Sequence, residues 1–156
     1  MTVYNIQMNT TMRTHLDEVI EVMGGKEVVP HIVNNSLDWI RVSKDLSIRA
    51  VRALQDRMNF TNKEVSRFIA ISESTLQRRL KEQTVLTTDE AEKTIQVATV
   101  IAQGISVFED EDDFRDWLHI KNPALGNIKP IELMHSSIGR EQIMDLLNRI
   151  EYSIYS

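Results

Sequence analysis

One segment, Asn59 to Lys81, constrains the fold of this 156-residue chain more than any other. Thr61 and Glu64 have the spacing of a capping box, in which each side chain satisfies a backbone N–H at the start of a helix. Apolar residues then repeat on one helical face, and Ser72 is placed to cap a second short helix. Two short helices joined by a tight turn predict a helix-turn-helix.

The second helix of this motif carries a polar stripe that includes arginine. Leu76 and Leu80 point to the opposite side. The residues that we predict to bind DNA are Ser74, Thr75, Gln77, Arg78, Arg79 and Lys81. Arginine and glutamine have side chains that hydrogen-bond to base edges. Arg79 lies about 100° around the helix from Arg78, so it would meet either a phosphate or a local carboxylate.

The alternative for this stretch is an ordinary helical hairpin with a solvated cationic face. Ala70 stands at the turn position that often carries glycine, and a left-handed residue with a Cβ costs roughly 1 kcal/mol. The distribution of charge favours DNA. Residues 41–81 hold ten Lys or Arg against four Asp or Glu, whereas residues 109–119 hold six acids against one Arg. In a chain of net charge −5, this asymmetry predicts one face for DNA and another for a different partner.

Helical periodicity continues on both sides of the motif, with no strand-like alternation of useful length. The expected helix starts are, in chain order, His15, Ser36, Ser47, Thr61, Ser72, Thr87, the acidic run Glu109–Asp113, Pro130 and Ser136. The predicted fold class is therefore all-α, with a repressor-like helix-turn-helix followed by a second helical region. We expect a flexible arm over residues 1–14, a helix-turn-helix and dimerisation region over 15–108, and a C-terminal region over 109–156.

The helix that opens at Thr88 and runs to about Ser106 has two adjoining apolar stripes. They consist of Ala91, Ile95, Ala98, Ala102 and Ile105, and of Val97, Val100 and Ile101. A face this wide must be covered on more than one side, so we expect a central core helix. We also expect a homodimer contact on or near it, because a dimer suits DNA sites with twofold symmetry.

The residue types argue against an enzyme or a metal protein. Cysteine is absent, and His15, His31, His119 and His135 have no ligand-spaced partner. Glycine-rich phosphate loops, nucleophile elbows and paired catalytic carboxylates are missing too, so we expect no catalytic residue, metal or cofactor. The apolar runs are too short to span a bilayer and the first residues lack a signal-peptide pattern, so we expect a cytoplasmic protein.

The last residues, from Glu151 to Ser156, are apolar and aromatic, unlike most chain ends. Tyrosine anchors many interfaces because it buries a large ring and keeps a hydroxyl for a partner. We expect this segment to be buried against another surface, either that of a partner or the core of its own chain.

From about Val19 to Ser156 the chain resembles the Xre/MbcA/ParS-type antitoxins. The motifs that carry the resemblance are Gly24-Gly25; Ser72 to Arg79; Leu86 with Glu90 to Lys93; Trp117-Leu118; Asn122 to Gly126; Pro130 with Leu133; Gly139; and the terminal Arg149 to Ser156. Ser74 stands where that pattern has arginine, and Asn127 where it usually has glycine.

This resemblance implies an antitoxin that neutralises an NAD-consuming toxin with a RES domain and represses its own operon by binding operator DNA as a homodimer. It also implies that the C-terminal segment blocks the toxin's active site. The implied toxin-binding residues are Leu147, Arg149, Ile150, Glu151, Tyr152, Ile154, Tyr155 and Ser156. The alternative is a stand-alone helix-turn-helix regulator that has no toxin partner.

Overall fold

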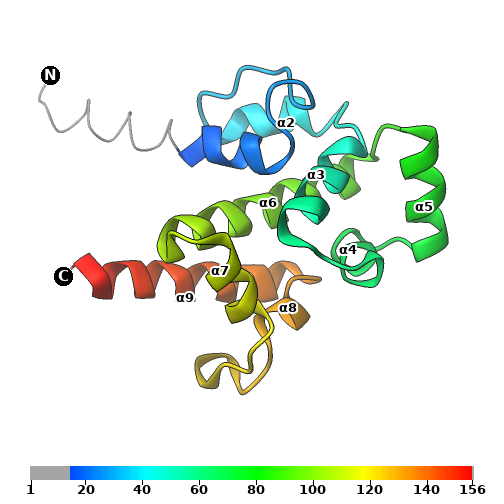
Figure 1. Cartoon of the computed structure of the whole chain (residues 1–156). Helices are drawn as coiled ribbons and strands as arrows, with labels where there is room; N and C mark the ends of the chain where they lie inside the picture. Colours follow the sequence, from blue (N-terminus) through cyan, green and yellow to red (C-terminus); the bar gives the residue numbers. More distant parts are fainter. Residues whose placement is uncertain (1–14, 156) are drawn as a thin grey trace, which may run out of the picture.

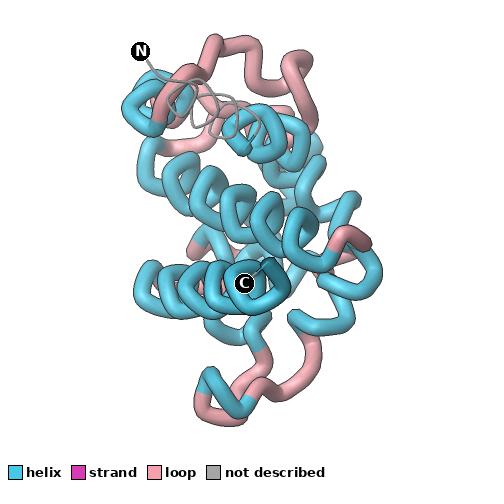
Figure 2. The backbone as a smooth tube through the Cα atoms, turned by 90° about the vertical axis from the view of Figure 1, so that its left-hand side faces the viewer, coloured by secondary structure: helices cyan, strands magenta, loops and turns pink. Residues whose placement is uncertain are grey.

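The computed structural model describes residues 15–155, and of Tyr155 it describes the backbone alone. Over these residues the chain is built from helices and loops, and no sheet is present (Figure 2). Two isolated bridges, Ser47 with Val85 and Asn122 with Ile128, are the only strand-like pairings in this part of the chain. The all-α prediction is confirmed. The expected arm at residues 1–14 lies outside the described residues.

A helix over residues 15–22 is followed by ten helical elements in the described part of the chain. These are η1 (Ser36–Asp38), α2 (Trp39–Val42), α3 (Arg49–Met58), α4 (Asn62–Ile69), α5 (Glu73–Glu82), α6 (Thr88–Phe108), α7 (Glu111–Leu118), η2 (Pro123–Leu125), α8 (Pro130–Leu133) and α9 (Ser137–Tyr155). None of the described helices is long and apolar enough to cross a membrane.

The capping residues predicted for the helix-turn-helix are confirmed. Thr61 Oγ1 accepts from the Glu64 N–H at 3.1 Å, and Glu64 Oε2 accepts from the Thr61 N–H at 2.9 Å. Ser72 Oγ accepts from the Thr75 N–H at 3.1 Å. Between α4 and α5, Ala70 adopts the left-handed conformation with φ 59° and ψ 46°. The tight turn of the motif therefore forms, although Ala70 has a Cβ that disfavours the left-handed conformation.

The expected cap at Ser36 is wrong. The side chain that caps this helix belongs to Asn35, which accepts from the Leu37 N–H at 2.9 Å. Asparagine and serine are comparable N-caps, so the sequence alone did not distinguish two adjacent candidates. Leu37 and Ile40 of this helical stretch are exposed, whereas Trp39 between them is half-buried against the core.

Helix α6 passes through the middle of the molecule (Figure 1). Both of its apolar stripes are buried within the chain, except that Ile105 is half-buried. The prediction of a central core helix is confirmed. Homodimerisation stays a prediction. Because the chain itself covers most of the two stripes, a dimer contact on α6 would have to use residues outside their buried part.

Helix α9 packs beside α6, and the two run in the same direction (Figure 1). Near the start of α9 Arg140 contacts Gln96, and two turns later Asn148 contacts Gln103. On α6, Gly104 allows α7 to approach closely, because a Cβ there would lie 2.1 Å from the ring of Phe114. This packing fixes the C-terminal helix against the central one.

Candidate functional site

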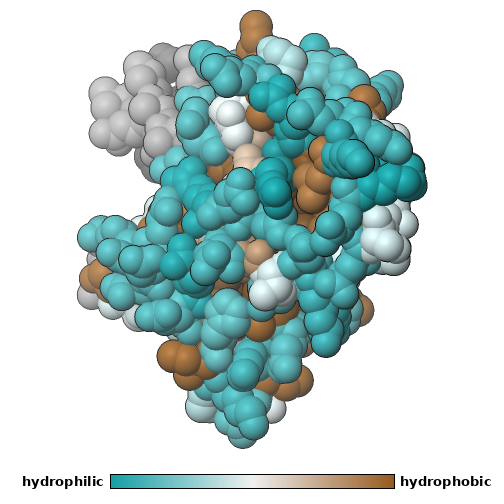
Figure 3. All heavy atoms as spheres, turned by 45° about the vertical axis from the view of Figure 1, so that its right-hand side comes forward, coloured by the Kyte–Doolittle hydropathy of each residue, from teal (hydrophilic) through white to brown (hydrophobic). Residues whose placement is uncertain are grey.

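Helix α5 lies at one side of the molecule (Figure 1). Most of its polar stripe is exposed to solvent. Ser74, Gln77, Arg78 and Lys81 are exposed, whereas Leu76 is fully buried against the core. Figure 3 brings this side forward, and it is mainly hydrophilic. Thr75 is half-buried, and its hydroxyl accepts from that of Ser72 at 2.8 Å, so it belongs to the helix cap.

Arg79 differs from its neighbour Arg78. Its Nη1 donates to both carboxylate oxygens of Glu90, which is 7% exposed. Of the two partners that the sequence left open for Arg79, the local carboxylate is the one it meets. Arg78 has only an exposed ion pair with Glu82 at 3.3 Å, which solvent screens strongly. Arg78 thus keeps its guanidinium available to a ligand, while Arg79 fastens α5 to the start of α6.

A groove of about 420 Å³ runs beside the polar stripe. Gln77 and Lys81 of α5 line it together with Arg49 and Arg52 of α3 and Asn62 of α4. The last three were not among the DNA-binding residues predicted from sequence. The signal that could have found them is the outward pair of arginines on the helix preceding the motif, followed by an amide at the first position of α4.

A buried amide orients two of these groove residues. Gln55 is almost fully buried; its Nε2 donates to Asn62 Oδ1 at 2.7 Å, and its Oε1 accepts from Arg52 Nη1 at 3.3 Å. Because the Asn62 oxygen is used in this way, the two N–H groups of its amide remain as donors. The groove thus presents cationic and amide donors together, a combination that suits phosphate oxygens and base acceptors.

One of the toxin-binding residues predicted in the C-terminal half of α9, Leu147, is wrong. Leu147 is fully buried in the hydrophobic core, so it is not available to a partner. Its face of the helix packs on α6, and periodicity alone could not tell what covers that face. Ile150 is half-buried at the edge of the same core, and Arg149 is exposed.

Beyond Ile150 the helix extends past the core, and its end points away from the body of the molecule (Figure 1). Tyr152 is 79% exposed and Ile154 is 59% exposed. Glu151 is half-buried and accepts from Gln103 Nε2 at 2.9 Å, which holds this last turn to α6. The side chain of Tyr155 and all of Ser156 lie outside the described residues.

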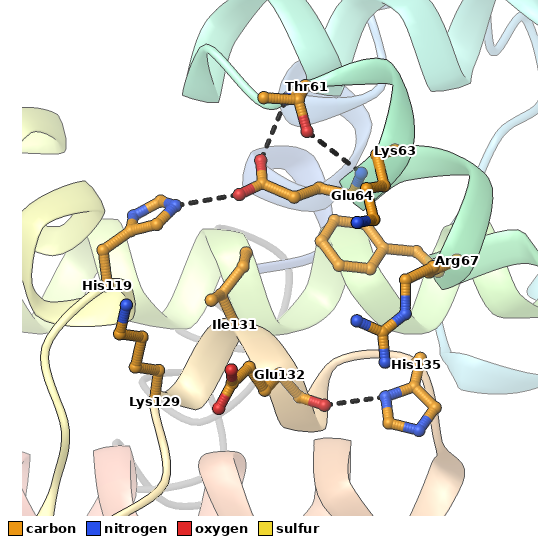
Figure 4. Close-up of a pocket in the computed structure, with 10 residues that line it drawn as sticks. Thr61, Lys63, Glu64, Arg67, His119, Lys129, Ile131, Glu132 and His135 are labelled. Carbon is orange, nitrogen blue, oxygen red and sulfur yellow. Dashed lines mark hydrogen bonds and ion pairs between the residues drawn. The ribbon is translucent and has the colours of Figure 1, made fainter. Parts of the chain in front are cut away.

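A third feature lies where α4 meets the C-terminal helices. Figure 4 shows His119 reaching from the end of α7 to Glu64, with Nε2 and Oε1 3.1 Å apart. The other ring nitrogen is 2.8 Å from the carbonyl oxygen of Arg115. This contact joins the capping box of α4 to the end of α7. Lys63 and other charged residues line the adjoining cavity of about 260 Å³.

Acidic and histidine side chains do not gather into a metal-binding group of three or more within the described part of the chain. The acidic run that begins at Glu109 has a structural role instead. Asp110 caps α7, and its Oδ1 accepts from the N–H groups of Asp112 and Asp113 at 2.8 and 3.0 Å. Acids in the first turn of a helix also interact favourably with its dipole, and a helix does start within this run as the sequence predicted.

Comparison with known families decides the identity. Residues 41–98 match the antitoxin Xre-like helix-turn-helix domain, and residues 103–152 match the antitoxin Xre/MbcA/ParS C-terminal toxin-binding domain. The chain belongs to the Xre/MbcA/ParS antitoxin family. Among curated proteins, antitoxin Xre of Photorhabdus laumondii subsp. laumondii is 23% identical over 116 residues, which cover 74% of this chain and 78% of that relative.

Membership of this family makes the chain an antitoxin of a toxin–antitoxin system, with a helix-turn-helix and a toxin-binding domain. The first match ends and the second begins within α6. The α5 groove lies in the first match, and both Tyr152 and the Gln103–Asn148 contact lie in the second. The long central helix is therefore shared by the two functional regions of the antitoxin.

Proposed function

We propose that this antitoxin neutralises a RES-domain toxin that consumes NAD, and that it represses its own operon by binding operator DNA. The observation that carries the proposal is that two unlike exposed surfaces belong to α5 and to the end of α9, which lie on opposite sides of the molecule (Figure 1). One is the cationic groove beside α5, and the other is the apolar last turn of α9.

The groove beside α5 and its oriented donors support the DNA function. Arg78 and Gln77 face outward from the second helix of the motif, where recognition helices meet base edges. Arg49, Arg52 and Lys81 supply charge for the phosphates on either side. In this proposal Arg78 contacts the bases, and Lys81, Arg49 and Arg52 contact the DNA backbone. Arg79 only positions α5.

Tyr152 and Ile154 at the end of α9 support the toxin function. A tyrosine and an isoleucine that are both largely exposed at the end of a helix have apolar surface that a partner can cover. The Glu151–Gln103 contact holds the preceding turn in place, so little ordering is needed when the complex forms. In this proposal the end of α9 enters the active-site cleft of the toxin and excludes its substrate.

Co-expression with the product of the neighbouring gene tests the pairing. The proposal predicts that the two proteins co-purify, that the antitoxin restores growth, and that it binds the DNA upstream of its own gene. For the DNA step, Arg78→Ala is compared with Lys121→Ala, because both side chains are exposed. We expect Arg78→Ala to cost roughly 1–3 kcal/mol of operator binding, and Lys121→Ala to leave it unchanged. Operator binding with no toxin found would favour a stand-alone regulator.

A further inference from the structure

Arg140 is a buried cation that has no acidic partner among the described residues. The residue is 5% exposed. Its Nε and Nη2 donate to Gln96 Oε1 at 3.0 and 2.7 Å, and its Nη1 donates to the Met134 carbonyl oxygen at 2.9 Å. All of these acceptors are neutral. Residues 1–14 contain no aspartate or glutamate, so they cannot add a side-chain carboxylate either.

The missing counter-charge has physical consequences for Arg140. Burial lowers the pKa of Arg140 below its ordinary value, because the charged form loses hydration without gaining an opposite charge. A guanidinium has five N–H donors, and the three hydrogen bonds use three of them. The free protein therefore keeps a desolvated positive charge with donors to spare, an arrangement that is costly unless a binding partner completes it.

Arg140 also lines a cavity of about 270 Å³ that opens to the surface between α6 and α9. Gln96 and Thr99 lie on the α6 side, and Met144 on the α9 side. A second cavity, of about 380 Å³, shares Gln96 and Thr99 and continues toward Trp39. The two cavities therefore adjoin at Gln96 and Thr99 of α6, and Arg140 lines the first of them.

We propose that Arg140 receives a carboxylate of the cognate toxin, from an aspartate or glutamate side chain that enters this cavity when the complex forms. The inference rests on the proposed function and adds a second contact to the end of α9. Arg140 lies within the matched toxin-binding domain. Arginine is among the residues that contribute most to interfaces, and charge-assisted hydrogen bonds to carboxylates are strong where water is excluded.

The lining of the cavity fits this occupant. Val100 and Met144 provide apolar walls that would shield the new ion pair from water, which strengthens it. Glu141 also borders the cavity but is exposed and makes no ion pair with Arg140. Its charge is screened by solvent, so it opposes an incoming carboxylate only weakly.

The test is Gln96→Glu, which replaces the amide oxygen beside Arg140 by a carboxylate of the same shape. The variant gives Arg140 an internal counter-charge. We expect the melting temperature of the free antitoxin to rise, and the affinity for the purified toxin to fall roughly 10- to 100-fold, because the incoming carboxylate meets a cation that is already paired. Gln142→Glu, which makes the same charge change on the exposed surface of α9, should alter neither quantity.

The outcomes distinguish a failure of the Arg140 contact from a failure of the proposed function. An unchanged or lower melting temperature in Gln96→Glu would overturn the claim that Arg140 lacks a counter-charge. A higher melting temperature with wild-type toxin affinity would make Arg140 purely structural and overturn the toxin contact. Failure of the wild-type antitoxin to bind any toxin would overturn the proposed function itself.

Discussion

Arg78 and Arg79 are adjacent in sequence, yet we predict that their substitution by alanine has opposite consequences. Arg79→Ala should destabilise the fold, and Arg78→Ala should not. Arg79 is 21% exposed and holds the carboxylate of Glu90, which is 7% exposed, with two hydrogen bonds. Arg78 makes one exposed ion pair with Glu82, a kind of contact that typically contributes less than about 1 kcal/mol.

The loss of stability expected for Arg79→Ala depends on the hydrogen bonds that Glu90 still makes without Arg79. Removing one member of a fully buried ion pair costs roughly 3–5 kcal/mol, because the other charge is left uncompensated. Here Glu90 Oε1 still accepts from the Thr87 N–H at 3.0 Å, and the gap left by Arg79 admits water. We therefore expect a loss of about 2–3 kcal/mol, which lowers the melting temperature of a chain of this size by roughly 5–10 °C.

The same pair gives a pH dependence with a defined sign. Burial raises the pKa of the Glu90 carboxyl, but the hydrogen bonds from Arg79 and Thr87 outweigh burial and leave it below its ordinary value of 4.5. A carboxyl whose pKa is lowered by folding stabilises the fold above its unfolded-state pKa, and that stability is lost as the pH falls through the folded-state value. The wild-type protein should lose stability below about pH 4.5, and Arg79→Ala should lose less over the same range.

Chemical unfolding measures these effects. It compares the wild type, Arg78→Ala, Arg79→Ala and the double variant that combines Arg79→Ala with Glu90→Ala. Relative to Arg79→Ala alone, the double variant should lose at most the contribution of the helix cap, which is about 1 kcal/mol. The reasoning would be refuted if Arg78→Ala and Arg79→Ala reduced stability equally. It would also be refuted if Arg79→Ala were fully stable and had lost operator binding.

Three further predictions concern the packing around the two proposed binding surfaces. Ala70→Gly should stabilise the fold by roughly 0.5–1 kcal/mol in urea unfolding, because the left-handed residue loses its Cβ. Gly104→Ala should destabilise it by about 1–3 kcal/mol, since the new methyl group meets the ring of Phe114; a melting temperature equal to wild type would contradict the close packing. Leu147→Ala should cost about 2–5 kcal/mol of stability, whereas Tyr152→Ala should stay within roughly 0.5 kcal/mol of wild type.

The features that the sequence predicted well depend on neighbouring residues. A capping box links residues three apart, so Thr61 with Glu64 and Thr87 with Glu90 could be found by reading along the chain. The two apolar stripes of α6 were visible for the same reason, since residues on one helical face recur at fixed spacing. These local signals were enough to define the fold class and the helix-turn-helix.

The features that the sequence missed depend on tertiary contacts. The amide that orients Asn62 lies on a different helix, and Gln96 lies 44 residues from Arg140. Periodicity showed that Leu147 shares a face with other apolar residues of α9, but not that α6 covers this face. Whether such a face meets its own chain or a partner is decided by the packing of distant segments, which no spacing rule contains.

Deletion of residues 152–156 tests the central claim most directly. The claim is that toxin neutralisation and operator binding use separate surfaces, the end of α9 and the groove beside α5. The truncated antitoxin and Arg78→Ala are each expressed with the toxin at matched levels, and growth and operator binding are measured for both. We predict that the truncated protein binds the operator like wild type but no longer restores growth, and that Arg78→Ala does the reverse. Full growth with the truncated protein, or equal loss of both activities in either variant, would contradict the account.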